Sequence, residues 1–165
     1  MNFKERLQKV KCFVFDIDGV LTDGQLHILQ DGTMLRNMNI KDGYALRQAF
    51  LKNYPIFVIS GSNAEGVKQR LKNLGIEEVY LNCKDKLDQL SVLLVKHHLT
   101  YEDVLYMGDD IPDLEVMKKC GVATCPNDAV HQIKAISIYI SDYCGGKGAV
   151  RDVIEQTLRL HGHFE

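Results

Sequence analysis

The 165-residue chain lacks long hydrophobic runs and has no excess of either charge. No apolar stretch approaches the roughly 18 residues that a membrane span requires, which argues against a membrane protein. The first segment, MNFKERLQKVKC, is charged over its first eleven residues, a pattern that is not typical of a secretory signal. We therefore expect a cytoplasmic protein without a membrane partner.

The charge balance and the cysteine spacing argue against nucleic-acid-binding proteins and against proteins stabilised by disulfides or zinc. Lysine and arginine number 20 and aspartate and glutamate 22, so the net charge is only −2. This argues against binding nucleic acid through bulk positive charge, and we expect no nucleic-acid partner. The five cysteines are an odd number without a C-x-x-C pair. They are typical of reduced thiols rather than of disulfides or a structural zinc site.

Prolines are also few, at three, and thirteen glycines are spread thinly along the chain. No repeat, low-complexity tract or linker is visible. Apolar residues make up 45% and charged residues 25%, which excludes a disordered or fibrous chain. The length is that of one ordinary domain, so we expect residues 1–165 to form a single domain.

Short apolar runs alternate with amphipathic stretches along most of the chain. The runs predicted to be strands are residues 10–15, 56–59, 79–81, 104–107, 122–124 and 137–140. The stretches predicted to be helices are residues 43–53, 64–74, 86–98, 112–120, 129–135 and 149–160. This alternation predicts an α/β fold with a doubly wound parallel sheet.

Residues 24–40 interrupt the alternation. Two strand-like pieces flank Gln30-Asp31-Gly32, and an Asp-Gly pair between such pieces favours a β-hairpin. We therefore expect a hairpin inserted after the first strand. Its apolar residues fall on both faces: Leu26, Ile28, Met34 and Met38 on one, Leu29 and Leu35 on the other. An exposed apolar hairpin of this kind favours association with other chains.

Polar residues follow the predicted strands at their carboxyl ends, where open α/β sheets bind ligands. In chain order these are Asp16 and Asp18, then Ser60, then Lys86, then Asp109, Asp110 and Asp113. Several carboxylates at one edge are costly unless a cation neutralises them, and an all-oxygen set suits Mg²⁺. Ser60 and Lys86 can hold the phosphate oxygens that the metal does not reach.

The motifs FDIDGVLTDG, VISGSN, CKDKL and YMGDDIPDL resemble the four motifs of the haloacid dehalogenase superfamily. DIDGVLTDG with an immediate hairpin, NIKDGYALR and GGKGAVRDV are similar to the capless 3-deoxy-D-manno-octulosonate (KDO) 8-phosphate phosphatases. The resemblance covers about residues 10–160. It implies a Rossmann-like fold without a cap domain and Mg²⁺-dependent hydrolysis of KDO 8-phosphate to KDO and phosphate.

By this resemblance Asp16 is the nucleophile that forms an aspartyl-phosphate. Asp18 would protonate the leaving alcohol and then activate water. Ser60 would bind the transferring phosphoryl group, and Lys86 would stabilise its charge. The resemblance places Mg²⁺ on the side chains of Asp16 and Asp109 and the backbone carbonyl of Asp18, with Asp110 and Asp113 close behind.

The resemblance also implies a substrate pocket over the same edge. Its residues would be Asn39, Ile40, Lys41, Asp42 and Gly43 in the loop after the hairpin, the cationic positions Arg47 and Arg70, and Lys86. It further implies a homotetramer in which four hairpins pack together and a neighbour's C-terminal segment approaches each site. Gly145, Gly146 and Gly148 would allow that approach, and Lys147 or Arg151 would bring positive charge.

One position departs from the family pattern. Where the family typically reads T-G-R, this chain reads Ser60-Gly61-Ser62, which keeps the hydroxyl and loses the arginine. A nine-carbon nonulosonate 9-phosphate, or another small sugar phosphate, therefore stays open as the substrate.

Two other classes of protein also stay open. A receiver domain would carry its acceptor aspartate after the third strand, where this chain has Asn82, Cys83 and Lys84. A regulatory protein that has kept the fold but lost catalysis would lack an essential carboxylate, whereas Asp16, Asp18 and Asp109 are all present.

Overall fold

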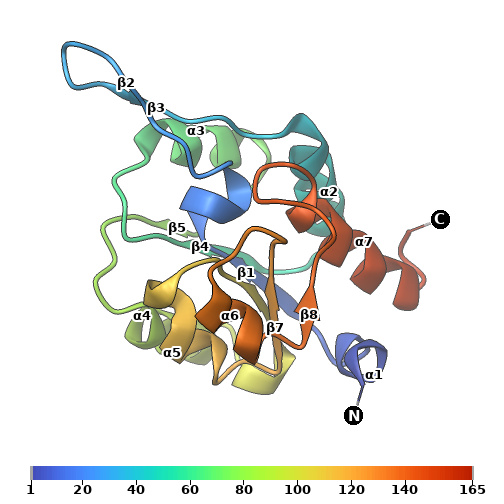
Figure 1. Ribbon diagram of the computed structural model, residues 1–165. Helices are drawn as coiled ribbons and strands as arrows, with labels where there is room; N and C mark the ends of the chain where they lie inside the picture. Colours follow the sequence, from blue (N-terminus) through green and yellow to red (C-terminus); the bar gives the residue numbers. More distant parts are fainter. Residues whose placement is uncertain (1, 165) are drawn as a thin grey trace.

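A sheet of six parallel strands runs through the middle of the molecule (Figure 1). The computed structural model describes residues 2–164. The strands are β1 (Cys12–Phe15), β4 (Ile56–Ile59), β5 (Val79–Tyr80), β6 (Val104–Met107), β7 (Val122–Cys125) and β8 (Tyr139–Ile140). Their order is β5-β4-β1-β6-β7-β8. After β1 the chain adds β4 and β5 on one side of it, and then crosses to add β6, β7 and β8 on the other side. This reversal puts the end of β1 where such sheets bind ligands.

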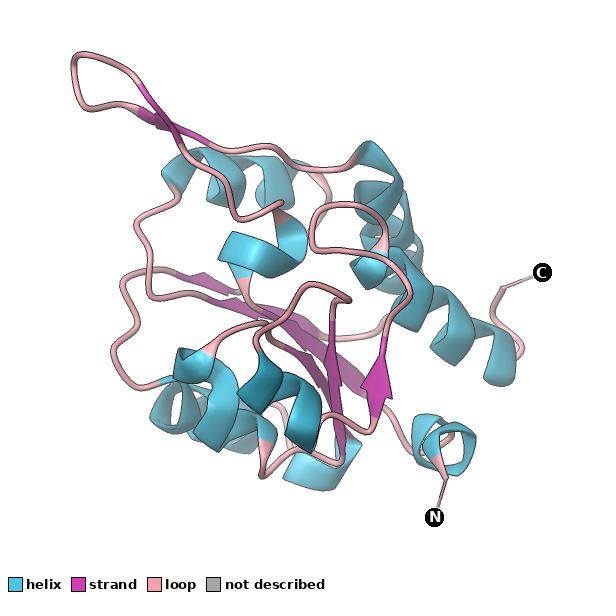
Figure 2. Cartoon of the chain, viewed as in Figure 1, coloured by secondary structure: helices cyan, strands magenta, loops and turns pink. Residues whose placement is uncertain are grey.

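Helices cover both faces of the sheet (Figure 2). One face carries α1 (Phe3–Leu7), α2 (Ile40–Leu51), α3 (Glu65–Asn73) and α7 (Ala149–Leu160); the other carries α4 (Lys86–Lys96), α5 (Leu114–Met117) and α6 (His131–Ile136). Successive residues of β1 point to opposite faces, so Phe13 and Val14 enter different cores. The predicted doubly wound α/β fold is confirmed. Within residues 2–164, no helix has the length and apolarity to cross a membrane.

Most helix boundaries differ from the predictions by a few residues, and the larger differences are these. The helix predicted at 43–53 begins at Ile40, because the Asn39 side chain accepts a hydrogen bond from the Lys41 N–H at 2.8 Å and caps it. The stretch 112–120 forms a 3₁₀ turn, Ile111–Asp113, followed by the short α5. Helix α1 and the 3₁₀ turn Tyr101–Asp103 are not predicted at all, since neither is long enough to show a period.

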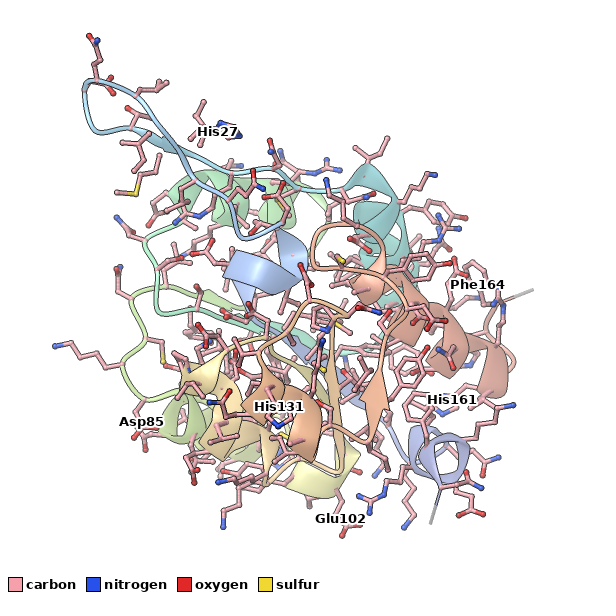
Figure 3. The ribbon with its side chains drawn as sticks, viewed as in Figure 1. His27, Asp85, Glu102, His131, His161 and Phe164 are labelled. Carbon is pink, nitrogen blue, oxygen red and sulfur yellow. The ribbon has the colours of Figure 1, made fainter. Side chains whose placement is uncertain are left out.

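The predicted hairpin is present between β1 and α2. Its strands are β2 (His27–Ile28) and β3 (Met34–Leu35), and the Leu29 N–H donates to the Thr33 carbonyl at 2.9 Å across the turn. The hairpin projects from the body of the molecule (Figure 1), and the His27 side chain lies at its surface (Figure 3). Five of its apolar residues are at least 43% exposed: Leu26, Ile28, Leu29, Met34 and Leu35. Met38 differs, because it is half-buried and packs against the core.

Candidate active site

Three carboxylates meet at the carboxyl edge of the sheet. Asp16 follows β1, and Asp109 and Asp113 follow the neighbouring β6. One oxygen of each lies within 4.8 Å of the others. The juxtaposition expected from the strand ends is therefore present.

Two glycines make room for this cluster. Gly19 has φ +87°, in the left-handed region, and a Cβ atom there would lie 1.9 Å from Asp109 Oδ2. A Cβ atom at Gly108 would lie 2.5 Å from the Cβ and Cγ atoms of Asp113. Any side chain at either position would displace a carboxylate.

Lys86 is buried between two of the carboxylates. Its Nζ lies 3.0 Å from Asp16 Oδ1 and 2.8 Å from Asp113 Oδ1. Asp113 also accepts hydrogen bonds from the Tyr106 hydroxyl at 2.8 Å and from the Asp109 N–H at 3.3 Å. Both carboxylate oxygens of Asp113 thus accept hydrogen bonds from other residues of the chain, and these bonds position Lys86 and the loop after β6. Tyr106 is a residue that sequence reasoning missed.

Burial makes the cluster costly without a cation. It raises the pKa of Asp16 to about 7, with the charge of Asp113 adding to the shift and Lys86 opposing it. Burial also raises the pKa of Asp109 to about 8, with Asp16 and Asp113 adding. For Lys86, burial alone would lower the pKa, but the two carboxylates outweigh it and the pKa is raised.

One buried oxygen of the cluster has no hydrogen-bond partner among the described residues. Asp109 Oδ1 is buried and accepts no hydrogen bond from the described residues. A buried carboxylate oxygen is usually satisfied, so an unpartnered one beside a second carboxylate is suited to binding a cation. The oxygen donors of Asp16 and Asp109 fit Mg²⁺.

Asp18 lies two residues beyond Asp16 at the mouth of the site. Its Oδ1 accepts a hydrogen bond from Arg36 Nε at 2.7 Å, and its Oδ2 accepts one from Nη2 at 3.4 Å. No motif contains Arg36, so sequence reasoning missed it; only the return of the hairpin brings it here. Ser60 directly follows β4, and the Oγ of this buried residue lies 3.0 Å from Ser62 Oγ.

Asp110 lies outside the cluster. Its side chain is exposed and accepts a hydrogen bond from the Ile111 N–H at 2.7 Å, capping the 3₁₀ turn. The turn after β6 directs Asp109 and Asp113 into the cluster and leaves Asp110 outside it, so the place of Asp110 near a metal stays a prediction.

The expected substrate residues divide between two cavities. One, of about 530 Å³, lies between the hairpin stem, α2 and α3 and is lined by Arg36, Asn39, Ile40 and Arg70 among others. The other, of about 450 Å³, is lined by Asn39, Lys41, Lys147 and Arg151 among others. Asn39 thus stands between them. A Cβ atom at Gly43 would lie 3.1 Å from Arg70 Nη2, so this glycine lets the arginine approach α2.

Two other expected substrate residues make contacts inside the chain. Asp42 is buried, and its carboxylate accepts hydrogen bonds from the Gly148 N–H at 3.3 Å and the Arg151 N–H at 2.9 Å. Arg47 donates to the Leu74 carbonyl at 3.2 Å. Neither residue lines the two cavities among the described residues. In this structure the packing of α2 against α7 and α3 takes up these polar groups, and a contact of either residue with substrate stays a prediction.

The segment expected to approach a neighbour's site also makes contacts within its own chain, and its approach to a neighbour stays a prediction. The Gly146 N–H donates to the Val20 carbonyl at 2.9 Å, and a Cβ atom at Gly145 would lie 1.8 Å from the Gly19 carbonyl oxygen. Lys147 Nζ lies 3.9 Å from Asp23 Oδ2. The glycines therefore allow close contact with residues 17–22 of the same chain, the candidate catalytic loop that carries Asp18. The sequence pattern alone does not distinguish this contact from one with a neighbouring chain.

No protein-family model matches the chain, but individual proteins do. It is 34% identical over 160 residues to the 3-deoxy-D-manno-octulosonate 8-phosphate phosphatase KdsC of Salmonella typhi, covering 97% of this chain and 85% of that one. It is 30% identical to KdsC of Haemophilus influenzae, covering 96% and 88%.

Solved structures agree. The 3-deoxy-D-manno-octulosonate 8-phosphate phosphatase of Moraxella catarrhalis, solved with magnesium, phosphate and KDO, is 32% identical with a TM-score of 0.94, over 98% of this chain and 92% of that one. A haloacid dehalogenase superfamily hydrolase of Legionella pneumophila is 30% identical with a TM-score of 0.93, over 96% and 87%. With strand order, carboxylate cluster and near full-length similarity in agreement, the chain belongs to the capless 3-deoxy-D-manno-octulosonate 8-phosphate phosphatase family of the haloacid dehalogenase superfamily.

Proposed function

We propose that this protein is a Mg²⁺-dependent phosphatase that hydrolyses KDO 8-phosphate to KDO and phosphate. The observation that carries the proposal is the pair Asp16 and Asp109 beside buried Lys86, with the buried Asp109 Oδ1 lacking a hydrogen-bond partner among the described residues. The names of its relatives, and the KDO, phosphate and magnesium bound to the Moraxella enzyme, support the choice of substrate and metal.

The metal would be held by the side chains of Asp16 and Asp109 and by the backbone carbonyl of Asp18. When bound, Mg²⁺ neutralises charge on the phosphate and the carboxylates. Lys86 remains paired with Asp16 and Asp113, and its positive charge offsets part of the repulsion between Asp16 and an approaching phosphate.

Asp16 is oriented for attack by two donors on one oxygen. Oδ1 accepts from the Ile17 N–H at 2.7 Å and lies 3.0 Å from Lys86 Nζ, whereas Oδ2 accepts no hydrogen bond from the described residues. The free oxygen attacks phosphorus as the bond to the substrate oxygen breaks, and Asp18 gives that oxygen its proton. Asp18 then takes a proton from water, which attacks the aspartyl-phosphate and releases phosphate. Ser60 donates to the phosphoryl group.

This function has a direct test. Purified protein should release phosphate from KDO 8-phosphate with Mg²⁺ and stop when EDTA is added. Asp16→Asn should lose activity, while Asp88→Asn, which removes an exposed carboxylate on α4, should retain it. Wild-type turnover by Asp16→Asn would reject the nucleophile assignment.

The second candidate substrate is a nonulosonate 9-phosphate. The observation that favours it is Ser62, which stands where the family typically has arginine and so removes a donor fork from the pocket. Arg70 and Lys41 remain exposed near the site and suit the carboxylate of either sugar acid. Comparing kcat/KM for both sugar-acid phosphates and for glucose 6-phosphate decides between them, and equal values for all three would reject a sugar-acid specificity.

For assembly, we propose a cytoplasmic homotetramer joined through the hairpins. The support is the exposed apolar side chains on both hairpin faces, since a lone two-stranded hairpin is marginal in water. Light scattering should give about four chains per particle at micromolar concentration. A variant lacking residues 25–38 should dissociate and slow, and a fully active monomer would reject the proposal.

A further inference from the structure

Arg36 and Asp18 form a two-point contact at the mouth of the site. The guanidinium faces both carboxylate oxygens, with Nε 2.7 Å from Oδ1 and Nη2 3.4 Å from Oδ2. The Arg36 side chain is only 9% exposed and the Asp18 side chain 36%. Among residues 2–164 the Asp18 carboxylate has no other hydrogen-bond or salt-bridge partner. Its orientation therefore depends on Arg36.

The backbone around Arg36 is anchored next to the catalytic loop. Met38 forms an isolated antiparallel bridge with Thr22, and Asn37 Nδ2 lies 3.3 Å from Asp23 Oδ2. Both partners follow the loop that carries Asp18. Arg36 therefore belongs to a stretch of backbone that is fixed against the segment carrying Asp18. These contacts set the distance between the Arg36 backbone and the Asp18 carboxylate.

We propose that Arg36 is a positioning residue for Asp18 and that the hairpin stem is part of the catalytic machinery. The inference rests on the proposed acid/base role of Asp18. Proton transfer requires the carboxyl group within hydrogen-bond reach of the leaving oxygen. An exposed aspartate without partners samples several rotamers, whereas an arginine fork on both oxygens selects one. Lysine, a single point charge, would not reproduce the fork.

A positioning role has a signature that a general structural role lacks. A weakly basic leaving group such as p-nitrophenolate departs without being protonated. The strongly basic alkoxide of benzyl alcohol needs a proton from a general acid as it departs. Losing the orientation of Asp18 should therefore reduce kcat/KM for benzyl phosphate more than for p-nitrophenyl phosphate. kcat/KM reports only the steps up to phosphoryl transfer, so the later hydrolysis of the aspartyl-phosphate does not obscure the comparison.

The test measures kcat/KM for p-nitrophenyl, phenyl and benzyl phosphate in the wild type, Arg36→Met, Arg36→Lys and Asp18→Asn. Arg6→Met is the matched control, because Arg6 is a half-buried arginine that donates to the Gly121 carbonyl on another part of the fold. A positioned general acid contributes about 10²–10⁴-fold, so we expect Arg36→Met to lose about tenfold more on benzyl than on p-nitrophenyl phosphate. Arg36→Lys should lie between it and the wild type, and Arg6→Met should show no such difference.

The outcomes distinguish a failure of the Arg36 role from a failure of the Asp18 role. With KDO 8-phosphate, Arg36→Met should lower kcat and leave KM nearly unchanged. An equal loss on all three aryl and benzyl esters, a rise in KM alone, or no loss would overturn the positioning role. If Asp18→Asn itself shows no leaving-group dependence, the proposed role of Asp18 fails instead. Circular dichroism and particle mass confirm that each variant is folded and assembled, and Arg36→Lys retains the charge if Arg36→Met is unstable.

Discussion

The carboxylate of Asp109 occupies the space that a Cβ atom at Gly19 would need. The two would be 1.9 Å apart, and Gly19 also has φ +87°. Left-handed backbone costs other residues about 1–2 kcal/mol, and overpacking costs about 1–3 kcal/mol more. The Asp109 carboxylate can therefore take its position only when residue 19 has no side chain.

Gly19→Ala should displace Asp109 and weaken Mg²⁺ binding by at least about tenfold, as judged by calorimetric titration. Gly32→Ala is a matched control, since Gly32 has the same φ of +87° but no atom within 4 Å of its would-be Cβ. It should show backbone strain without loss of Mg²⁺ affinity. Equal Mg²⁺ affinities for the two variants would contradict this account.

Tyr106→Phe should slow catalysis without removing any charge. The buried hydroxyl donates to Asp113 Oδ1, the same oxygen that Lys86 contacts. Its loss should cost about 1–2 kcal/mol of stability and lower kcat several-fold, because Asp113 then holds Lys86 less firmly. Thermal unfolding and steady-state kinetics check this, with the exposed Tyr44→Phe as control. Unchanged kcat would mean that Asp113 positions Lys86 unaided.

Sequence patterns predict the strands and helices that show a clear apolar periodicity, and the polar residues that directly follow the strands. Asp16, Ser60 and Asp109 were found because parallel strands bring their carboxyl ends to one edge. The hairpin was found because Asp31-Gly32 is a turn signal.

Contacts between residues far apart in the chain were not predictable in the same way. Arg36 reaches Asp18 only because the hairpin stem returns, and Asp42 meets Gly148 and Arg151 across 106 and 109 positions of the sequence. Tyr106 points inward from a strand whose residues are all buried, so periodicity does not mark its hydroxyl as polar and functional.

Without Mg²⁺, stability should fall as pH rises. The pKa of Asp16 is raised to about 7 and that of Asp109 to about 8, so between about pH 4 and 8 the folded chain binds more protons than the unfolded chain. The free energy of unfolding then decreases with pH across this window. In EDTA, the melting temperature should be lower at pH 8 than at pH 5.

Mg²⁺ should reverse this trend, because binding replaces the protons. The rise in melting temperature on adding Mg²⁺ should be larger at pH 8 than at pH 5. Asp109→Asn should flatten the pH dependence in EDTA, and Asp88→Asn should preserve it. A metal-free melting temperature that increases from pH 5 to 8 in the wild type, with the same slope in Asp109→Asn, would contradict the assignment.

Asp42→Asn distinguishes a role in packing from a role in substrate binding. The buried carboxylate accepts hydrogen bonds from the backbone N–H groups of Gly148 and Arg151 at the start of α7. An amide keeps one acceptor and turns its NH₂ toward a donor, so the variant should lose about 1–2 kcal/mol in urea unfolding. Because the segment before α7 contacts the catalytic loop through Gly146 and Val20, kcat should also fall several-fold.

Asp85→Asn removes an exposed charge at the start of α4 and keeps its capping oxygen, so it should change neither the stability nor kcat much. If Asp42→Asn instead raised KM for KDO 8-phosphate tenfold at unchanged stability, the carboxylate would be contacting substrate, and the packing role argued from its hydrogen bonds would be wrong.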